Sequence, residues 1–363
     1  MIQRLAYFYV LRGSVGDMFD KDKVRKATTI TDMYAALDLG QRTVRAVLKR
    51  QDGKIVKELK IKKQADSVLK FLNGTNANIV MESGYNYQCL YDLLKSEGYN
   101  VKVAHPLMVK AIAYAKVKTD KVDARILADL LRTDMIPECY IPNEDIRNLR
   151  DLARRRHYFV NTRTMFKNKV HVELSKRWID YSSTDNNNNS DLFTRKGKEY
   201  LYSLKISGVK DCLDTIDFLN KKIQEMDNEI KIVANNDRYA RHLTTIPGIS
   251  YYAALLISSE IADINRFPDY VHLSSYAKLV PGTHQSGETQ YSKTDKKGSQ
   301  MLNWIMVQCI HTHVRYCNSS VTKHYNKIKS RKGSKIAIIA AARKMMRVIY
   351  VMLKEDRSFR PDG

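Results

Sequence analysis

Short apolar runs separated by turn residues predict a β-sheet in the first third of the chain. Residues 34–39 are apolar except for Asp38 and are followed by a glycine, which is typical of a buried strand. Residues 43–50 and 54–61 alternate between apolar and polar side chains around an Asp-Gly turn signal, a pattern that predicts a β-hairpin. Two more apolar runs, at 78–82 and 100–104, predict further strands.

Helical periodicity alternates with the later strands. Residues 65–73 suit a short helix, residues 85–98 a longer one that stops at a glycine, and residues 107–133 are largely helical. The resulting order is an antiparallel meander that leads into β-α-β units. This order predicts one mixed sheet with helices on its faces.

The strand pattern disappears between Asn143 and about Val233. Two long helical stretches, 143–178 and 210–233, flank an asparagine-rich tract at 185–190. Two long polar helices joined by such a tip fit a protruding coiled-coil arm, and they fit an ordinary helical linker equally well.

A second compact unit is expected to begin near Leu243. The segment 246–250 (Ile-Pro-Gly-Ile-Ser) is a turn before a helix at 252–261, and it resembles a helix-hairpin-helix. In that motif the glycine turn offers backbone N–H groups to phosphate, so Gly248 is a candidate nucleic-acid contact, although any turn between two helices has this pattern.

The rest of the C-terminal part is expected to be helical around a polar loop. Residues 273–280 look helical, a polar loop follows at 283–299, and two helices are expected at 301–316 and 334–354 with a basic segment, 323–335, between them.

The net charge of the chain indicates what kind of partner it binds. The 363 residues include 62 Lys and Arg against 39 Asp and Glu, a net charge of +23. Residues 292–363 alone have 16 basic and 4 acidic side chains, a net charge of +12. Such a surplus favours nucleic acid as partner, with a merely well-solvated basic surface as the alternative.

Location is expected to be cytoplasmic and associated with the nucleoid. No run approaches the roughly 20 apolar residues of a membrane helix, and no secretory signal is predicted. Five cysteines without a Cys-x-x-Cys pair are typical of reduced thiols. Cys309, His313 and Cys317 follow one another at four-residue steps along a helix, and are interpreted as packing residues because the outer two are too far apart to share one ion.

Four carboxylates stand out by their positions. Asp38 ends the first strand, Glu82 ends the fourth, and Asp120 and Asp123 lie three apart on the following helix, hence on one face. In the expected topology the first and fourth strands are neighbours at the centre of the sheet. Like charges gather only when a cation joins them, so the set predicts an Mg²⁺ (or Mn²⁺) site that orients a scissile phosphate.

Several short motifs together resemble one known family, the DEDD insertion-sequence transposases with a RuvC-like domain. The resemblance covers about residues 33–355. It is carried by Ala-Leu-Asp-Leu-Gly at Asp38, Met-Glu-Ser-Gly-Tyr at Glu82, His105-Pro106, Lys118-Thr119-Asp120-Lys121-Val122-Asp123-Ala124, Ile246-Pro247-Gly248-Ile249, Phe267, Tyr276-Ala277, Gln285-Ser286-Gly287, Ser292-Lys293 and Lys297-Gly298-Ser299.

The resemblance implies a serine nucleophile and further partners. Ser286 matches the family's strand-transfer serine, and neighbouring cations could stabilise charge on the attacked phosphate. It also implies a structured guide RNA from the element's own non-coding end, and donor and target DNA. Exchange of two DNA ends requires at least two active centres, so a homo-oligomer (dimer or tetramer) is expected. The candidate nucleic-acid contacts are Gly248, Lys293, Lys296, Lys297, Arg331, Lys332 and Lys335.

The expected organisation is α/β followed by α. We expect an N-terminal extension at 1–32, an RNase-H-like (RuvC-like) mixed-sheet domain with the four acids at 33–142, a helical coiled-coil arm at 143–240, and a mostly α C-terminal transposase domain with Ser286 at 241–363.

Three other functions remain open on sequence grounds. A metal-dependent nuclease or junction resolvase would use the acids with Ser286 as a structural residue. An ATPase or kinase of the actin-like fold also opens with a strand ending Asp-x-Gly, but it expects a second, duplicated phosphate strand. A non-catalytic nucleic-acid-binding protein would not need four acids and a serine at motif positions.

Overall fold

The computed structural model describes residues 32–84, 86–112, 119–180, 192–280, 282–286, 289–293 and 298–361, and within these ranges it leaves out the side chains of Asp120 and of both strands at 282–293. The chain divides into two compact units between Ile141 and Pro142. No helix among the described residues combines the length and apolar character needed to cross a bilayer.

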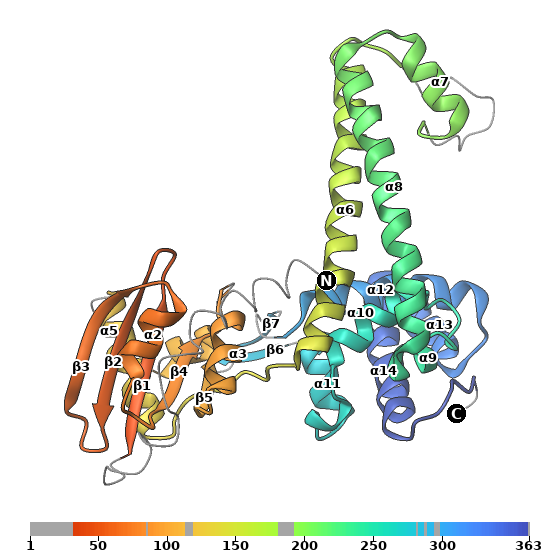
Figure 1. Ribbon diagram of the computed structural model, residues 1–363. Helices are drawn as coiled ribbons and strands as arrows, with labels where there is room; N and C mark the ends of the chain where they lie inside the picture. The colour runs from red at the N-terminus through yellow and green to blue at the C-terminus, as the bar shows by residue number, and fades with distance from the viewer. Residues whose placement is uncertain are drawn as a thin grey trace. The chain divides into compact units, whose positions relative to one another are not determined.

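The first unit contains a five-stranded sheet with strand order β3-β2-β1-β4-β5. Strand β1 pairs antiparallel with β2 and parallel with β4, and β4 pairs parallel with β5, so β1 and β4 are central neighbours. The predicted hairpin and mixed sheet are confirmed (Figure 1). The elements are β1 (Met33–Leu39), β2 (Thr43–Arg50), β3 (Ile55–Lys62), α2 (Ala65–Leu72), β4 (Asn78–Glu82), α3 (Gln88–Ser96), β5 (Val101–Ala104), α4 (Pro106–Ile112) and α5 (Asp120–Arg132).

Strand alternation divides the apolar side chains of the sheet between its two faces. Ala35 and Leu37 pack with α2 and α3 in one cluster, whereas Ala36 and Val80 pack with α5 in another. The predicted helix at 107–133 is two helices, α4 and α5, and residues 113–118 between them are outside the described ranges.

The second unit begins with two long helices that lie side by side and run in opposite directions (Figure 1). Near the tip they share a core with α7 that includes Val170, Leu201 and Leu213. The base of the pair belongs to the core of the C-terminal helices, through Leu152 and Ile230. The elements are α6 (Glu144–Ser175), α7 (Arg195–Ser203) and α8 (Ser207–Asn236).

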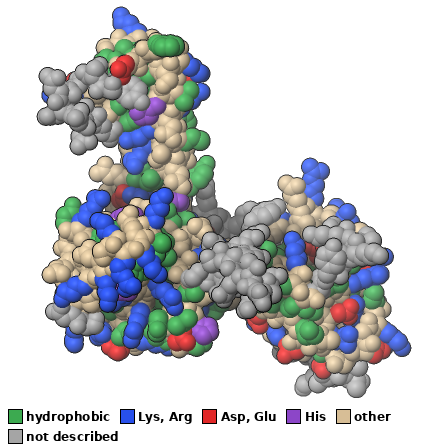
Figure 2. All heavy atoms as spheres, turned by 180° about the vertical axis from the view of Figure 1, so that it is seen from behind, with side chains coloured by type: hydrophobic (Ala, Val, Ile, Leu, Met, Phe, Trp, Pro, Cys, Tyr) green, Lys and Arg blue, Asp and Glu red, His purple; other side chains and the backbone are tan. Residues whose placement is uncertain are grey.

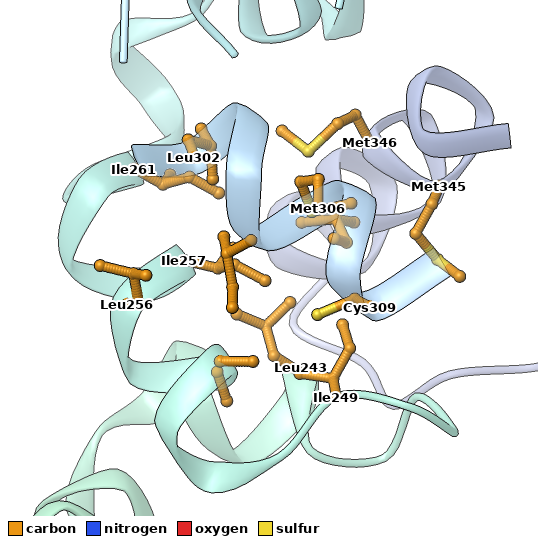
Figure 3. Close-up of a cluster of buried hydrophobic side chains, with 14 of the residues drawn as sticks. Leu243, Ile249, Leu256, Ile257, Ile261, Leu302, Met306, Cys309, Met345 and Met346 are labelled. Carbon is orange, nitrogen blue, oxygen red and sulfur yellow. The ribbon is translucent and has the colours of Figure 1, made fainter. Parts of the chain in front are cut away.

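The C-terminal helices surround one apolar core. Figure 3 shows side chains that meet there, among them Leu256, Met306 and Met345. The elements are α9 (Arg238–Leu243), α10 (Tyr251–Ile261), a 3₁₀ turn (Ile264–Arg266), α11 (Tyr270–Tyr276), β6 (Gly282–Ser286), β7 (Thr289–Lys293), α12 (Gln300–Tyr316), α13 (Ser320–Lys332) and α14 (Ser334–Lys354).

Two sequence predictions in this unit were wrong. The predicted polar loop at 283–299 contains the antiparallel hairpin of β6 and β7. The helix predicted at 273–280 lies earlier, as α11. The basic segment 323–335 follows α12, as expected; α13 covers most of it and α14 begins at its end.

Candidate active site

Asp38 and Glu82 lie at the carboxyl ends of the two central parallel strands. The register pairs Leu37 with Met81, and each acid directly follows its paired residue. Side chains alternate along a strand, so both acids are on the same face as Ala36, the face that α5 covers. Both are half-buried, as expected for groups at the rim of a sheet.

Helix α5 brings its first turn toward the same end of the sheet. Buried Ala124 and Leu127 form the stripe that packs on β1 and β4, and Asp120 and Asp123 precede these residues by four positions each. The Thr119 hydroxyl accepts a hydrogen bond from the N–H of Val122 and caps the helix. Asp123 is half-buried, and the Asp120 side chain is outside the described part of the chain.

Two ion pairs hold α5 on the sheet. Lys49 of β2, which is 5% exposed, donates to Asp129 over 2.6 Å. Arg125 donates to Glu58 of β3 over 2.6 Å, and this hydrogen bond lowers the pKa of the Glu58 carboxyl. The helix that carries Asp123 is therefore fixed to β2 and β3 at its middle, which limits how far its first turn can move.

A pocket of about 260 Å³ opens between the end of β1 and the start of α5. In the register of the sheet, Asp38 of β1 lies opposite Arg45 of β2, and Arg45 lies opposite Lys60 of β3. One acid and two cations thus form a row across three strands. The pocket is lined by Asp38, Gly40, Thr43, Arg45, Lys60, Thr119 and Lys121.

Sequence reasoning missed Arg45 and Lys60. The signal was present, because the predicted hairpin fixes which residues of its two strands are opposite one another, and both positions fall on the face of Asp38. By sequence alone these two residues could not be distinguished from the other Lys and Arg residues, of which the chain has 62 in all.

The four acids are a suitable donor set for a hard divalent cation, since carboxylate oxygens are the ligands that Mg²⁺ and Mn²⁺ prefer. Among the side chains that the structure describes, no group of three or more His, Cys, Asp or Glu residues is placed to hold a metal ion. Asp120, the fourth member of the set, is not one of those side chains.

Ser286 is the last residue of β6, at the turn end of the hairpin, where it pairs with Thr289. Ser292 pairs with Thr283, next to the open end. Lys293 closes that end opposite Gly282, and Lys296 and Lys297 fall outside the described residues.

Ser299, the third serine of this region, has a structural position. It is 8% exposed and caps α12, accepting a hydrogen bond from the N–H of Leu302 over 3.1 Å. Its hydroxyl donates to Glu260 over 2.9 Å. Both hydrogen-bonding roles of the hydroxyl are thus used within the fold.

Gly248 is explained by packing against α12. Its φ is +95°, and a Cβ there would lie 2.8 Å from the backbone nitrogen of His313 and 3.0 Å from the carbonyl oxygen of Cys309. Cys309 is in the apolar core and the ring of His313 is bonded to Pro247 and Ser319, which agrees with the interpretation of both as packing residues. Contact between Gly248 and phosphate stays a prediction.

Arg331, Lys332 and Lys335 are exposed around the turn from α13 to α14. No side chain caps the N-terminus of α14 among the described residues, and Lys335 lies in the first turn of this helix. Figure 2 shows Lys and Arg side chains gathered on one face of the C-terminal helices. Exposed cations beside a helix N-terminus favour a phosphate ligand.

Comparison with known proteins defines the class. A family model described as transposase, of the DEDD and IS110 type, matches residues 35–178, and a model described as transposase of the IS116/IS110/IS902 family matches residues 240–326. Both units are thus similar to DNA transposases and recombinases. The chain belongs to the IS110-type DEDD transposases.

Individual relatives cover most of the chain. It is 23% identical to the transposase for insertion sequence element IS1111A of Coxiella burnetii, over 78% of this chain and 79% of the relative. It is 26% identical to the pilin gene-inverting protein of Moraxella bovis, over 79% of this chain and 83% of the relative. The match to a Sinorhizobium fredii protein named as transposase y4qE is 25% identical and spans 57% of that relative's length.

Proposed function

We propose that this protein cuts and rejoins DNA to move an insertion sequence, with the four acids and Ser286 as its reacting groups. The observation that carries the proposal is the arrangement of Asp38 and Glu82 on neighbouring strand ends below the first turn of α5. The sheet order and this placement of acids support an RNase-H-like, RuvC-like fold for the first unit.

Asp38, Glu82, Asp120 and Asp123 are the residues that would hold a divalent cation. Such a cation would withdraw charge from the oxygens of a scissile phosphate. Arg45 and Lys60, in the row beside Asp38, would bind the flanking phosphates and keep the DNA strand across the pocket. A pocket with Asp38 at one end of the row and cations beside it would give the strand a defined orientation.

Ser286 would make the covalent step. Its oxygen attacks phosphorus, a Ser–O–P bond forms, the P–O3′ bond breaks, and the proton of the hydroxyl is transferred so that the departing 3′ oxygen leaves as a hydroxyl. The reverse attack by another 3′-hydroxyl rejoins DNA without further energy input. Among the three nearby serines, Ser286 has the turn position and Ser299 is committed to a cap and to Glu260.

The basic surface of the second unit would hold nucleic acid. The exposed cations of α13 and α14 suit a phosphate backbone, of DNA or of a guide RNA whose base pairing selects the sites. A retained discrete RNA species in the purified protein, and loss of site choice on RNase treatment, would support the guide.

A second candidate function is site-specific inversion of a chromosomal segment. The similarity to pilin gene-inverting proteins of two Moraxella species favours it, and inversion needs the same cutting and rejoining steps. Both candidates are tested by incubating the full chain with Mg²⁺ and DNA that contains its flanking ends, with and without the associated RNA. Sequencing of joined products distinguishes excision from inversion, and hydrolysed ends alone would instead indicate a plain nuclease.

A further inference from the structure

Glu260, near the end of α10, is a buried carboxylate at the junction of three elements. It is 1% exposed. Arg154 of α6 donates to its Oε1 through two nitrogens, over 2.6 and 3.0 Å. Ser299 donates to its Oε2 over 2.9 Å, so one carboxylate joins the base of the long helix pair to the N-cap of α12.

Further hydrogen bonds strengthen the same junction. Arg150, one turn before Arg154 on α6, donates to the carbonyl oxygen of Ser259 over 2.8 Å. Arg266 donates to the carbonyl oxygen of Glu260 over 3.2 Å. The end of α10 is therefore held by three arginines and cannot shift without breaking charge-assisted hydrogen bonds.

The Ser286 hairpin leaves the C-terminal helices through a narrow neck, formed by residues 276–278 and 298–303, and Ser299 is part of it. The N–H of Ser299 donates to the carbonyl oxygen of Tyr276 over 2.7 Å. Asn303 donates to the carbonyl oxygens of Ala277 and Lys278 over 3.2 and 3.0 Å.

The two chain segments of the neck also approach too closely for a side chain. Gly298 has a φ of +93°, and a Cβ there would lie 2.3 Å from the carbonyl oxygen of Tyr276. The segment that leaves α11 and the segment that enters α12 are thus held together at the base of the hairpin. Because Ser299 is hydrogen-bonded to Tyr276, a contact that fixes Ser299 also fixes both ends of the segment that carries Ser286.

We infer that Glu260 is a positioning residue for the Ser286 hairpin, and that its pair with Arg154 anchors the neck to the base of α6. This rests on the proposed function, in which Ser286 attacks DNA. Burying a charge costs free energy, and well-packed apolar side chains of similar volume often stabilise a core as well as a buried ion pair does. A fixed neck instead supplies orientation, on which an in-line attack depends steeply.

The test compares variants of the full chain for two readouts. One is the rate of covalent protein–DNA adduct formation at saturating DNA. The other is the rate of trypsin cleavage after Lys278 and Lys293 in the free protein, followed by mass spectrometry. Glu260→Gln and Arg154→Ala should slow adduct formation at least about tenfold, because small misplacements of a reacting group are costly. They should speed cleavage at those two sites and leave DNA affinity unchanged.

Two further variants separate positioning from general stability. Asn303→Ala loosens the neck without touching the buried charge, and should slow the adduct as well. Asp227→Asn breaks another ion pair of α6, with Arg156 over 2.9 Å, which does not reach the neck. It should leave both readouts as in the wild type. Arg154→Lys, which keeps the charge, should restore part of the rate.

The outcomes are separable. Wild-type adduct and cleavage rates in Glu260→Gln would overturn the inference. So would equal losses in Glu260→Gln and Asp227→Asn that follow their melting temperatures. If the wild type forms no adduct, or Ser286→Ala still forms one, the serine assignment fails, and the trypsin comparison still decides whether Glu260 fixes the neck.

Discussion

Asp38 and Arg45 are directly opposite one another on the antiparallel strands β1 and β2, with Lys60 next in the same row on β3. An acid at the centre of the sheet is thus followed outward by two cations. Carboxylates repel a phosphate and cations attract it, so the row defines where a metal ion and where a bare backbone phosphate are favoured. The arrangement gives the pocket a direction along which DNA can be placed.

Removal of one acid tests the metal site. Asp38→Asn keeps the shape of the side chain but loses its charge, so the fold should stay intact while DNA cleavage falls by at least about 10²-fold, as when a single transition-state stabiliser is removed. Circular dichroism and a cleavage assay measure the two effects. Excess EDTA should abolish wild-type cleavage, and full activity in EDTA would contradict the metal proposal.

The cationic end of the row is tested separately. Arg45→Ala should weaken binding of DNA and flatten the dependence of log affinity on log salt by roughly 0.9 for each phosphate that the protein no longer neutralises. Lys54→Ala removes an equally positive but 82% exposed side chain at the distant hairpin turn, and should leave the slope unchanged. An unchanged slope in Arg45→Ala would place the DNA elsewhere.

The sequence predicted the first unit well and the second less well, for physical reasons. The strands at 34–39 and 78–82 are strongly apolar and the hairpin has an Asp-Gly turn, so the hairpin and the neighbouring positions of the first and fourth strands could be predicted. Strands β6 and β7 are polar on both faces, from Thr283 to Ser292, and no hydrophobic alternation marks them.

The candidate site residues also differ in how far the sequence could predict them. Asp38 and Glu82 could be predicted because their positions depend on the ends of apolar strands. Arg45 needed the cross-strand register, and Glu260 needed contacts between residues more than 100 positions apart, such as that with Arg154. Tertiary contacts of this kind leave no periodic trace in the sequence.

The long helix pair offers a surface for self-association. Tyr158, Met165 and Val172 follow one another at seven-residue steps on α6 and are 66%, 61% and 46% exposed. Such spacing is typical of a coiled-coil seam, and exchange of two DNA ends needs at least two active centres. We therefore propose that a second copy packs there.

Met165→Lys should lower the apparent mass in sedimentation equilibrium, because a charge in an apolar seam is costly. Gln224→Lys, at an exposed position on the neighbouring helix α8, is the matched control and should leave the mass unchanged. A wild type that is monomeric both free and on DNA would refute the seam.

The buried His313 predicts a pH dependence of stability. Burial lowers its pKa, and the hydrogen bond to Pro247 opposes this shift. The neutral ring donates from Nδ1 to the Pro247 carbonyl oxygen over 2.6 Å and accepts from Ser319 at Nε2 over 2.7 Å. Its folded pKa is thus below the unfolded value of about 6.5.

The sign of the effect follows. Below about pH 6.5 the unfolded chain binds the proton more readily, so the free energy of unfolding should fall as the pH decreases from about 7.5 to about 5. Urea unfolding at both values measures it. His313→Gln should reduce the difference. Burial also lowers the pKa values of His157 and His324, so these two residues account for the pH dependence of stability that remains in His313→Gln.

The last prediction concerns the covalent step at Ser286. Ser286→Ala should bind DNA as the wild type does and form no protein–DNA adduct, because the attacking oxygen is gone. Ser292→Ala should keep the adduct. Ser299→Ala should keep the same attachment site but form the adduct more slowly and lose about 0.5–2 kcal/mol of stability, the usual cost of removing a helix cap. A denaturing gel of protein trapped on nicked DNA, followed by mass spectrometry of the linked peptide, separates these cases. Attachment to Ser292 would keep the recombinase chemistry and move the nucleophile to β7. Cleavage by the Ser286→Ala protein with water as nucleophile would instead leave the acids of the first unit as a complete nuclease, and Ser286 as a structural residue of the hairpin.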